Sequence, residues 1–293
     1  MLYGAIEAGG TKFICAVADS PTSEPIDTLK IDTTTPDETL SQVIAFFKRF
    51  ELRALGVASF GPIDLQRDSP TYGYITATPK VGWKNTDLVQ HLQKTFNVPT
   101  GFDTDVNAAA LAEVQYGAAQ GLTHAVYITV GTGIGGGAVI NGQMLHGLVH
   151  PEMGHLPVRR HPHDTYVGHC PYHKDCLEGM ACGPALAARW GVPAGNLPDD
   201  HEAWEFEAYY LARAITAMVY TLSPQRVILG GGVMHQLQLF PRIRNNVVEM
   251  LNDYIQSSAI TEHIDTFIVP PGLGDRSGAV GALTLAQRAE RGQ

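Results

Sequence analysis

Three side chains that could bind one metal ion stand within seven residues of this chain, at Cys170, His173 and Cys176. The chain has only 4 cysteines, so this run holds half of them. A C-x2-H-x2-C run can present two thiolates and one imidazole to a tetrahedral zinc ion. The fourth ligand is missing from the run, and His155, fifteen residues before Cys170, is the best candidate. We predict a structural Cys2His2 zinc site, with a polar loop that carries two unpaired thiols as the alternative.

Glycine-rich turns follow two stretches that have the apolar pattern of buried strands. Residues 2–8 (LYGAIEA) lead into residues 9–12 (GGTK), and residues 125–130 (AVYITV) lead into residues 131–137 (GTGIGGG). A second strand pattern follows each turn, and a shift of 122 residues lays the first segment over the second. Because glycine has no β-carbon, the backbone of such a turn can approach a phosphate and direct several N–H groups at it. The repeated turn favours phosphate binding, with ordinary β-hairpins as the alternative.

A third glycine cluster, residues 230–234 (GGGVM), follows the strand pattern 226–229. Neither of the two related turns matches the G-x4-G-K-[ST] motif, and neither leads straight into a helix. P-loop and dinucleotide-binding motifs are therefore poor interpretations. Three glycine clusters at strand ends favour a nucleotide site that is neither a P-loop nor a dinucleotide-binding motif. A single cluster would not be enough for this prediction.

Transfer of a phosphoryl group to a hydroxyl needs a base that positions and deprotonates the hydroxyl. Asp105 is the candidate, because it stands where a strand pattern ends and a helical pattern begins. We expect its side chain to project into the cleft between two lobes. Aspartate is also among the best helix N-cap residues, so capping remains the alternative role.

Composition limits the class of protein. The 293 residues, 44% of them hydrophobic, are enough for two domains, and the net charge of −9 argues against a nucleic-acid surface. No apolar run approaches the ~20 residues that span a bilayer, and the sequence has no secretory leader pattern. Cysteines arranged as metal ligands fit a reducing compartment. We therefore expect a cytoplasmic protein that binds neither nucleic acid nor a membrane.

Strand patterns alternate with helical patterns, which predicts an α/β architecture in two lobes. We place the boundary after residue 117, which gives lobes of residues 1–117 and 118–293, and the last helix could pack on the first lobe. The segment 157–200 holds the metal motif and is expected to be an insertion in the second lobe. The helical patterns cover residues 36–50, 87–97, 106–117, 201–222, 241–255 and 276–290.

Six motifs together resemble the ROK family (repressors, open reading frames and kinases), whose sugar kinases have the two-lobed, actin-like fold of hexokinase with a duplicated ribonuclease H-like motif. The resemblance extends from residue 3 to about residue 285, and the motifs occur in family order. The runs 78–83 (TPKVGW) and 150–152 (HPE), with the C-x2-H-x2-C loop, are similar to the bacterial fructokinase branch. The six motifs are residues 7–12 (EAGGTK), 59–62 (SFGP), 105–108 (DVNA), 131–137 (GTGIGGG), 152–155 (EMGH) and 176–179 (CLEG).

The resemblance implies a homodimeric enzyme that uses ATP and Mg²⁺ to phosphorylate D-fructose at the 6-hydroxyl and carries a structural Zn²⁺. The motifs do not fix the sugar, so a kinase for mannose, glucose or an N-acetylated amino sugar remains an alternative. A non-catalytic sugar sensor on the same fold is the alternative from another class. The presence of Asp105 and of the phosphate turns argues against a sensor.

The resemblance also assigns residue roles, with Asp105 as the base. The residues expected at the sugar are Gly61, Pro62, Asn107, Glu152, His155 and Glu178. The residues expected at the ATP phosphates are Gly9, Gly10, Thr11, Lys12, Thr132 and Gly133. The residues expected beside the adenosine are Pro184, Gly230, Gly231, Gly232, Val233 and Met234. The implied zinc ligands are His155, Cys170, His173 and Cys176.

Glu7 and His155 have features that bear on the expected metal sites. Glu7 stands where the family usually has aspartate, and its longer side chain leaves open how Mg²⁺ is held. If one ring nitrogen of His155 binds zinc, the other nitrogen carries the proton. His155 would then act at the sugar only as a hydrogen-bond donor.

Overall fold

The computed structural model describes residues 1–293, and the chain forms two compact units. The first unit contains Met1–Tyr116, Met144–Pro151 and Arg276–Gln293, and the second contains Gly117–Gln143 and Glu152–Asp275. The sequence placed a boundary after residue 117, but it did not anticipate that residues 144–151 would belong with the first unit. None of the helices combines the length and the hydrophobicity that a membrane-spanning segment requires.

The first unit contains a five-stranded sheet in the order β3-β2-β1-β4-β7. β1 pairs antiparallel with β2 and parallel with β4, and β4 pairs parallel with β7. Because β1, β4 and β7 run the same way, their carboxyl ends meet at one edge of the sheet. The strands are β1 (Leu2–Ala8), β2 (Lys12–Ala18), β3 (Asp27–Asp32), β4 (Leu52–Ser59) and β7 (Thr100–Thr104).

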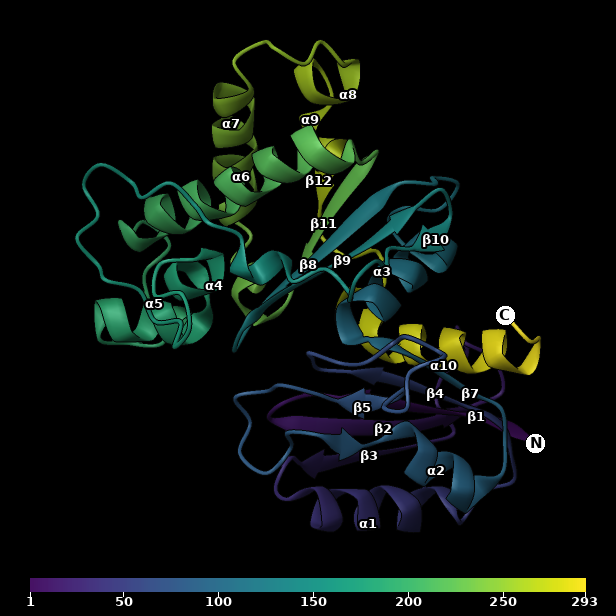
Figure 1. Ribbon diagram of the computed structural model, residues 1–293. Coiled ribbons are helices and arrows are strands. Elements are labelled where there is room, and N and C mark those ends of the chain that lie inside the picture. Colours follow the sequence, from purple (N-terminus) through teal and green to yellow (C-terminus); the bar gives the residue numbers. More distant parts are fainter. The chain divides into compact units, whose positions relative to one another are not determined.

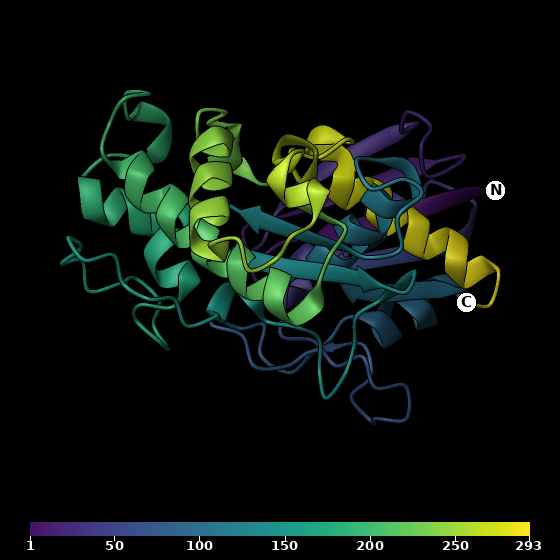
Figure 2. The ribbon, with the colours of Figure 1, turned by 90° about the horizontal axis from the view of Figure 1, so that it is seen from above.

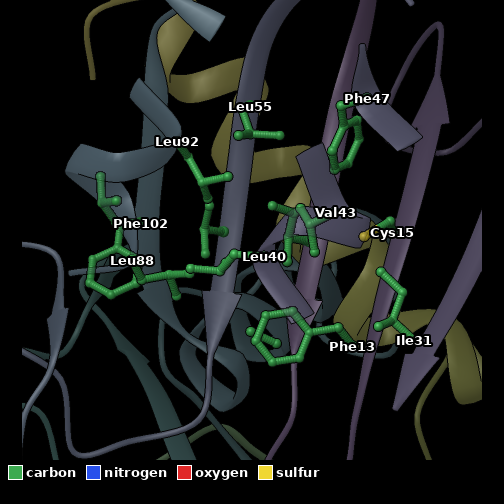
Figure 3. Packing of buried hydrophobic residues seen from close by; sticks show 14 of the residues in the cluster. Phe13, Cys15, Ile31, Leu40, Val43, Phe47, Leu55, Leu88, Leu92 and Phe102 are labelled. Carbon is green, nitrogen blue, oxygen red and sulfur yellow. The ribbon is translucent and has the colours of Figure 1, made fainter. Parts of the chain in front are cut away.

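Helices cover both faces of this sheet (Figure 1). α1 (Pro36–Phe47) and α2 (Val89–Phe96) lie on one face, where their apolar side chains pack with those of the strands (Figure 3). α3 (Asp105–Tyr116) and α10 (Ser277–Glu290) lie on the other face. A short two-stranded sheet, β5 (Tyr74–Ile75) with β6 (Thr86–Asp87), completes this unit.

α10 approaches the sheet closely because Gly56 on β4 has no side chain. A β-carbon at Gly56 would lie 1.8 Å from the carbonyl oxygen of Ala282. Any larger residue there would push the helix away and open a cavity in the small-residue core beneath it. The last helix therefore packs within the first unit, although it lies at the far end of the sequence.

The second unit repeats this sheet, in the order β10-β9-β8-β11-β12. β8 pairs antiparallel with β9 and parallel with β11, and β11 pairs parallel with β12. The 122-residue repeat in the sequence is therefore a repeat of sheet topology. The strands are β8 (Ala125–Val130), β9 (Ile134–Ile140), β10 (Gln143–Met144), β11 (Arg226–Gly230) and β12 (Ile268–Val269).

The helices of the second unit include α6 and α7, which pack against one another, as two views show (Figures 1 and 2). The predicted helical patterns do not include the insertion 157–200, but the chain forms two short helices there, α4 and α5. Because α4 has 5 residues and α5 has 8, neither gives a clear helical period in the sequence. The helices and 3-10 turns of this unit are η1 (Met153–His155), α4 (Leu177–Ala181), α5 (Gly183–Trp190), η2 (Ala194–Asn196), α6 (Ala203–Leu222), η3 (Gly232–His235), α7 (Leu239–Leu251), α8 (Ser258–Thr261) and α9 (Ile264–Phe267).

Candidate functional site

One edge of the first unit's sheet gathers three of the predicted site segments. Ala8, Ser59 and Thr104 are the last residues of β1, β4 and β7, and they pair in register. The glycine turn at 9–12, the loop that contains Gly61 and Pro62, and Asp105 therefore all begin at this edge. Sequence motifs that are almost one hundred residues apart are brought together by strand pairing alone.

Asp105 begins α3, and an N-cap bond is made by the residue before it. That bond belongs to Thr104, whose hydroxyl oxygen accepts a hydrogen bond from the Asn107 N–H at 3.1 Å. Asp105 is half-buried, and its Oδ1 accepts from the N–H of Val106 at 2.9 Å. Thr104 therefore contributes to the cap of α3, a role for which the sequence had offered Asp105.

Asn107 lies in a buried polar network. Its side chain is only 1% exposed, and its amide nitrogen donates to Asp103 Oδ1 at 2.9 Å. Asp103 is equally buried, and its other carboxylate oxygen lies 2.7 Å from Nε2 of His146. This hydrogen bond raises the pKa of His146 above its usual value. Asn107 thus orients Asp103 and His146, two residues that carried no role in the sequence prediction.

The segment 144–151 is held to the first unit by a second histidine. The backbone N–H of Ile63 donates to Nε2 of His150 at 3.0 Å, and burial lowers the pKa of this ring. An acceptor nitrogen and a lowered pKa both describe a neutral imidazole. Pro62, next to Ile63, accepts two hydrogen bonds at its carbonyl oxygen from Thr76. The predicted sugar loop at Gly61 and Pro62 is therefore fixed on both sides.

The first glycine turn is closed by a hydrogen bond from the Gly9 N–H to the carbonyl oxygen of Lys12 at 3.0 Å. The hydroxyl of Thr33 donates to the Gly9 carbonyl at 2.7 Å, and the Thr33 N–H donates to the carbonyl of Thr11 at 3.0 Å. Thr11 and Lys12, in this turn, are exposed. Glu7, just before this turn, is half-buried, and burial raises its pKa.

The four predicted metal ligands converge in the second unit. The ligand atoms of His155, Cys170, His173 and Cys176 all lie within 4.8 Å of one another. The Nδ1 atom of His155 is 3.8 Å from Cys170 Sγ and 3.5 Å from Cys176 Sγ, and His173 Nδ1 is 3.8 Å from Cys170 Sγ. Zn–S and Zn–N bonds of about 2.3 and 2.0 Å give tetrahedral sulfur–nitrogen edges of about 3.5 Å. The cluster therefore has the size and the donor set of a zinc site.

The predicted sugar ligands of the second unit lie beside this cluster. Glu152 precedes η1, and partial burial, with the charge of Glu178 adding to it, raises its pKa to about 7. Glu178 is in the first turn of α4, two residues after Cys176, and its Oε2 accepts from the N–H of Ile134 at 3.0 Å. Glu152, His155 and Glu178 are thus neighbours, and Glu178 also contacts the second glycine turn.

The predicted ATP residues of the second unit meet at the carboxyl edge of its sheet. The Gly131 N–H donates to the carbonyl of Gly133 at 2.9 Å, which closes the turn that exposes Thr132. The N–H of Gly183 donates to the Gly131 carbonyl at 2.8 Å, so Pro184 and the start of α5 lie next to the turn. The predicted adenosine segment, Gly230, Gly231, Gly232, Val233 and Met234, adjoins the same edge, where a β-carbon on Gly231 would lie 2.5 Å from the carbonyl of Val130.

Comparison with known proteins shows which family this chain resembles. The sequence model of the ROK family matches residues 3–289. Fructokinase of Zymomonas mobilis is 45% identical over 299 residues, covering 99% of this chain and 97% of that protein. Fructokinase of Pediococcus pentosaceus is 43% identical over 289 residues, covering 99% of both. The crystal structure of the ROK hexokinase from Thermus thermophilus matches with a TM-score of 0.78 at 25% identity and covers 100% of both chains. The predicted α/β, hexokinase-type fold is confirmed.

Proposed function

This chain belongs to the ROK family, and we propose that it is a fructokinase that transfers the γ-phosphoryl group of ATP to the 6-hydroxyl of D-fructose. The observation that carries the proposal is the identity of 43–45%, over nearly the whole chain, with two fructokinases. The sites support it, because a base candidate and two phosphate turns stand at the carboxyl edges of their sheets.

Asp105 is the proposed base. Its carboxylate would accept the proton of the 6-hydroxyl while that oxygen attacks the γ-phosphorus and ADP leaves. Its place at the start of α3, directly after the last residue of β7, supports this role. Phosphoryl transfer depends mainly on positioning and on charge stabilisation, so a fixed helix start is part of the mechanism.

The phosphates are assigned to the two glycine turns, 9–12 and 131–137. Thr132 and Gly133 are the proposed ligands of the γ- and β-phosphates, and Thr11 and Lys12 are proposed phosphate ligands as well. Mg²⁺ neutralises phosphate charge in such reactions and prefers oxygen ligands. Glu7 and Asp105, at the carboxyl edge of the first sheet, carry ligands of that type.

Zn²⁺ is the proposed occupant of the Cys2His2 cluster, where it would serve as a structural cross-link. Because Nδ1 of His155 faces the thiols, Nε2 is the atom left to donate a proton to a sugar hydroxyl. Glu152 and Glu178 are the proposed acceptors for other ring hydroxyls. The ion would organise the sugar ligands and would take no part in phosphoryl transfer.

A panel of hexoses with coupled detection of ADP tests the proposal. Fructose should give the highest kcat/KM, with mannose, glucose and N-acetylmannosamine as competitors and Asp105→Asn as the inactive control. A higher kcat/KM for any competitor would assign the chain to another ROK sugar kinase. Binding of ADP without turnover of any hexose would instead support a sugar sensor. We also propose a homodimer, which light scattering after size-exclusion chromatography tests.

A further inference from the structure

The second glycine turn is held by segments that carry the metal ligands. Glu178 Oε2 accepts a hydrogen bond from the backbone N–H of Ile134, which ends the turn at the start of β9. Gly154, which directly precedes His155, lies so close that a β-carbon there would be 1.7 Å from the carbonyl oxygen of Ile134. Ile134 is therefore fixed at its N–H by the segment after Cys176 and at its carbonyl by the segment before His155.

The segment after Cys176 is in turn tied to the rest of the metal loop. Cys176 is the N-cap residue of α4, and Glu178 is in the first turn of that five-residue helix. A β-carbon at Gly179 would lie 1.8 Å from the carbonyl of Lys174, so α4 packs directly on the loop between the cysteines. The N–H of Leu177 donates to the carbonyl of Leu156 at 3.0 Å, which joins α4 to the residue after His155.

The metal loop is otherwise held by two backbone hydrogen bonds between Cys170 and Lys174 and by an ion pair between Arg160 and Asp175. Between the cysteines, Tyr172, His173, Lys174 and Asp175 are all exposed, and the loop buries few apolar side chains. Segments of this kind open locally at low cost in free energy. A metal ion bound by His155, Cys170, His173 and Cys176 would cross-link the two segments that contact Ile134, the one before His155 and the one after Cys176.

Glu178 places a carboxylate beside a turn that is proposed to bind phosphate. A carboxylate repels phosphate, yet here its oxygen lies 2.7 Å from the point where a β-carbon on Gly133 would be. Only glycine at 133 leaves room for this contact, and the hydrogen bond to Ile134 directs the carboxylate onto the backbone. Hydrogen bonds to a charged group are stronger than hydrogen bonds between neutral groups.

We propose that Glu178 is a positioning residue for the phosphate-binding turn, through which the metal site controls nucleotide affinity even when no sugar is bound. The inference rests on the proposed kinase function, because it takes the turn 131–137 to be a phosphate site. It adds a second role to the sugar contact assigned to Glu178. A residue that acts only on the sugar has no effect on ADP binding in the absence of sugar, and this difference makes the proposal testable.

The test is titration of the full chain with Mg–ADP by calorimetry, without fructose. Glu178→Ala should raise the Kd for ADP about tenfold, since it removes one charge-assisted hydrogen bond from the turn. Glu178→Gln keeps an oxygen that can accept from Ile134 and should restore the Kd to within about threefold of the original value. Glu249→Gln, at an exposed carboxylate on α7, is the matched control and should leave the Kd unchanged.

A second measurement covers the case in which Glu178→Ala does not fold. The unmodified protein is treated with a zinc-selective chelator in excess Mg²⁺, its metal content is measured, and ADP is titrated again. Loss of zinc should raise the Kd for ADP severalfold while near-ultraviolet circular dichroism still reports a folded core. An unchanged Kd, either in folded Glu178→Ala or after verified loss of zinc, would overturn the proposal. Failure of the unmodified protein to bind any nucleotide would count instead against the proposed function.

Discussion

The two glycine turns occupy the same place in two sheets of the same topology, but they are supported in different ways. The turn 9–12 is held by Thr33, which follows the neighbouring strand β3 in the same sheet. The turn 131–137 is held by Glu178 and Gly183, which belong to segments inserted between β10 and β11. A duplicated motif can therefore keep its backbone shape while its two copies depend on unrelated parts of the molecule.

This difference predicts that the two turns respond differently to loss of the metal ion. The first turn needs one threonine hydroxyl and one backbone hydrogen bond, and no metal ligand lies near it in the sequence. The second turn is contacted on both sides of Ile134 by segments that carry the candidate metal ligands, Glu178 from one and Gly154 from the other. Metal removal should thus act on one copy of the motif and spare the other.

The largest effect should come from the first unit. Asp105→Asn keeps the shape of the side chain and removes the base, and general-base catalysis contributes about 10²–10⁴-fold. We expect kcat to fall at least about 100-fold, with little change in the KM for fructose. Thr104→Ala is the stability control, since loss of an N-cap costs about 1 kcal/mol and should lower the melting temperature. A kcat near that of the unmodified enzyme in Asp105→Asn would remove Asp105 from the mechanism.

Loss of a metal ligand should rank second. Cys170→Ser, His173→Ala and Cys176→Ser should each release the ion, lower the melting temperature and raise the KM for fructose about 10–100-fold. Metal analysis comes first, and we expect one zinc ion per chain. A metal-free preparation with full activity would refute the site, and a variant that lost zinc but kept its KM for fructose would refute the link to the sugar.

A smaller effect should follow from Thr33→Val at the first turn. The change keeps the side-chain shape and removes the hydroxyl that donates to Gly9, a hydrogen bond that contributes about 0.5–1.5 kcal/mol. We expect a rise of a few-fold in the KM for ATP, and the same ratio should be found before and after zinc is chelated. A ratio that depended on zinc would contradict the independence of the two turns.

The smallest effect concerns pH. The pKa of His146 is raised in the folded protein by its hydrogen bond to Asp103, so the pair contributes stability that is complete below the unfolded pKa of about 6.5. This contribution is lost as the pH rises through the higher, folded pKa. The melting temperature of His146→Gln should therefore fall furthest below that of the unmodified protein near pH 5.5 and approach it near pH 8.5. A difference that grew with pH would reverse the assigned direction of the pKa shift.

The sequence anticipated features that depend on residue type and short spacing. His155 was selected as the fourth ligand because it was a histidine in a motif beside the loop, and its Nδ1 lies between the two thiols. The repeated glycine turns predicted the repeated sheet, because strand, turn and strand are close in the sequence. Asp105 was correctly placed at the start of a helix, but the N-cap bond of Thr104 was not predicted, because the sequence offered aspartate, a residue type preferred at N-caps.

Contacts between distant residues were decided only by the tertiary structure. Asp103 and His146 are 43 residues apart, and Glu178 and Ile134 are 44 apart, so no local pattern joins them. The assignment of 144–151 to the first unit rests on such contacts as well. The sequence by itself determined which chemical groups this protein has and on which turns they stand. Strand pairing and loop packing decided which backbone segment each of these groups contacts, because those contacts form only when the chain folds.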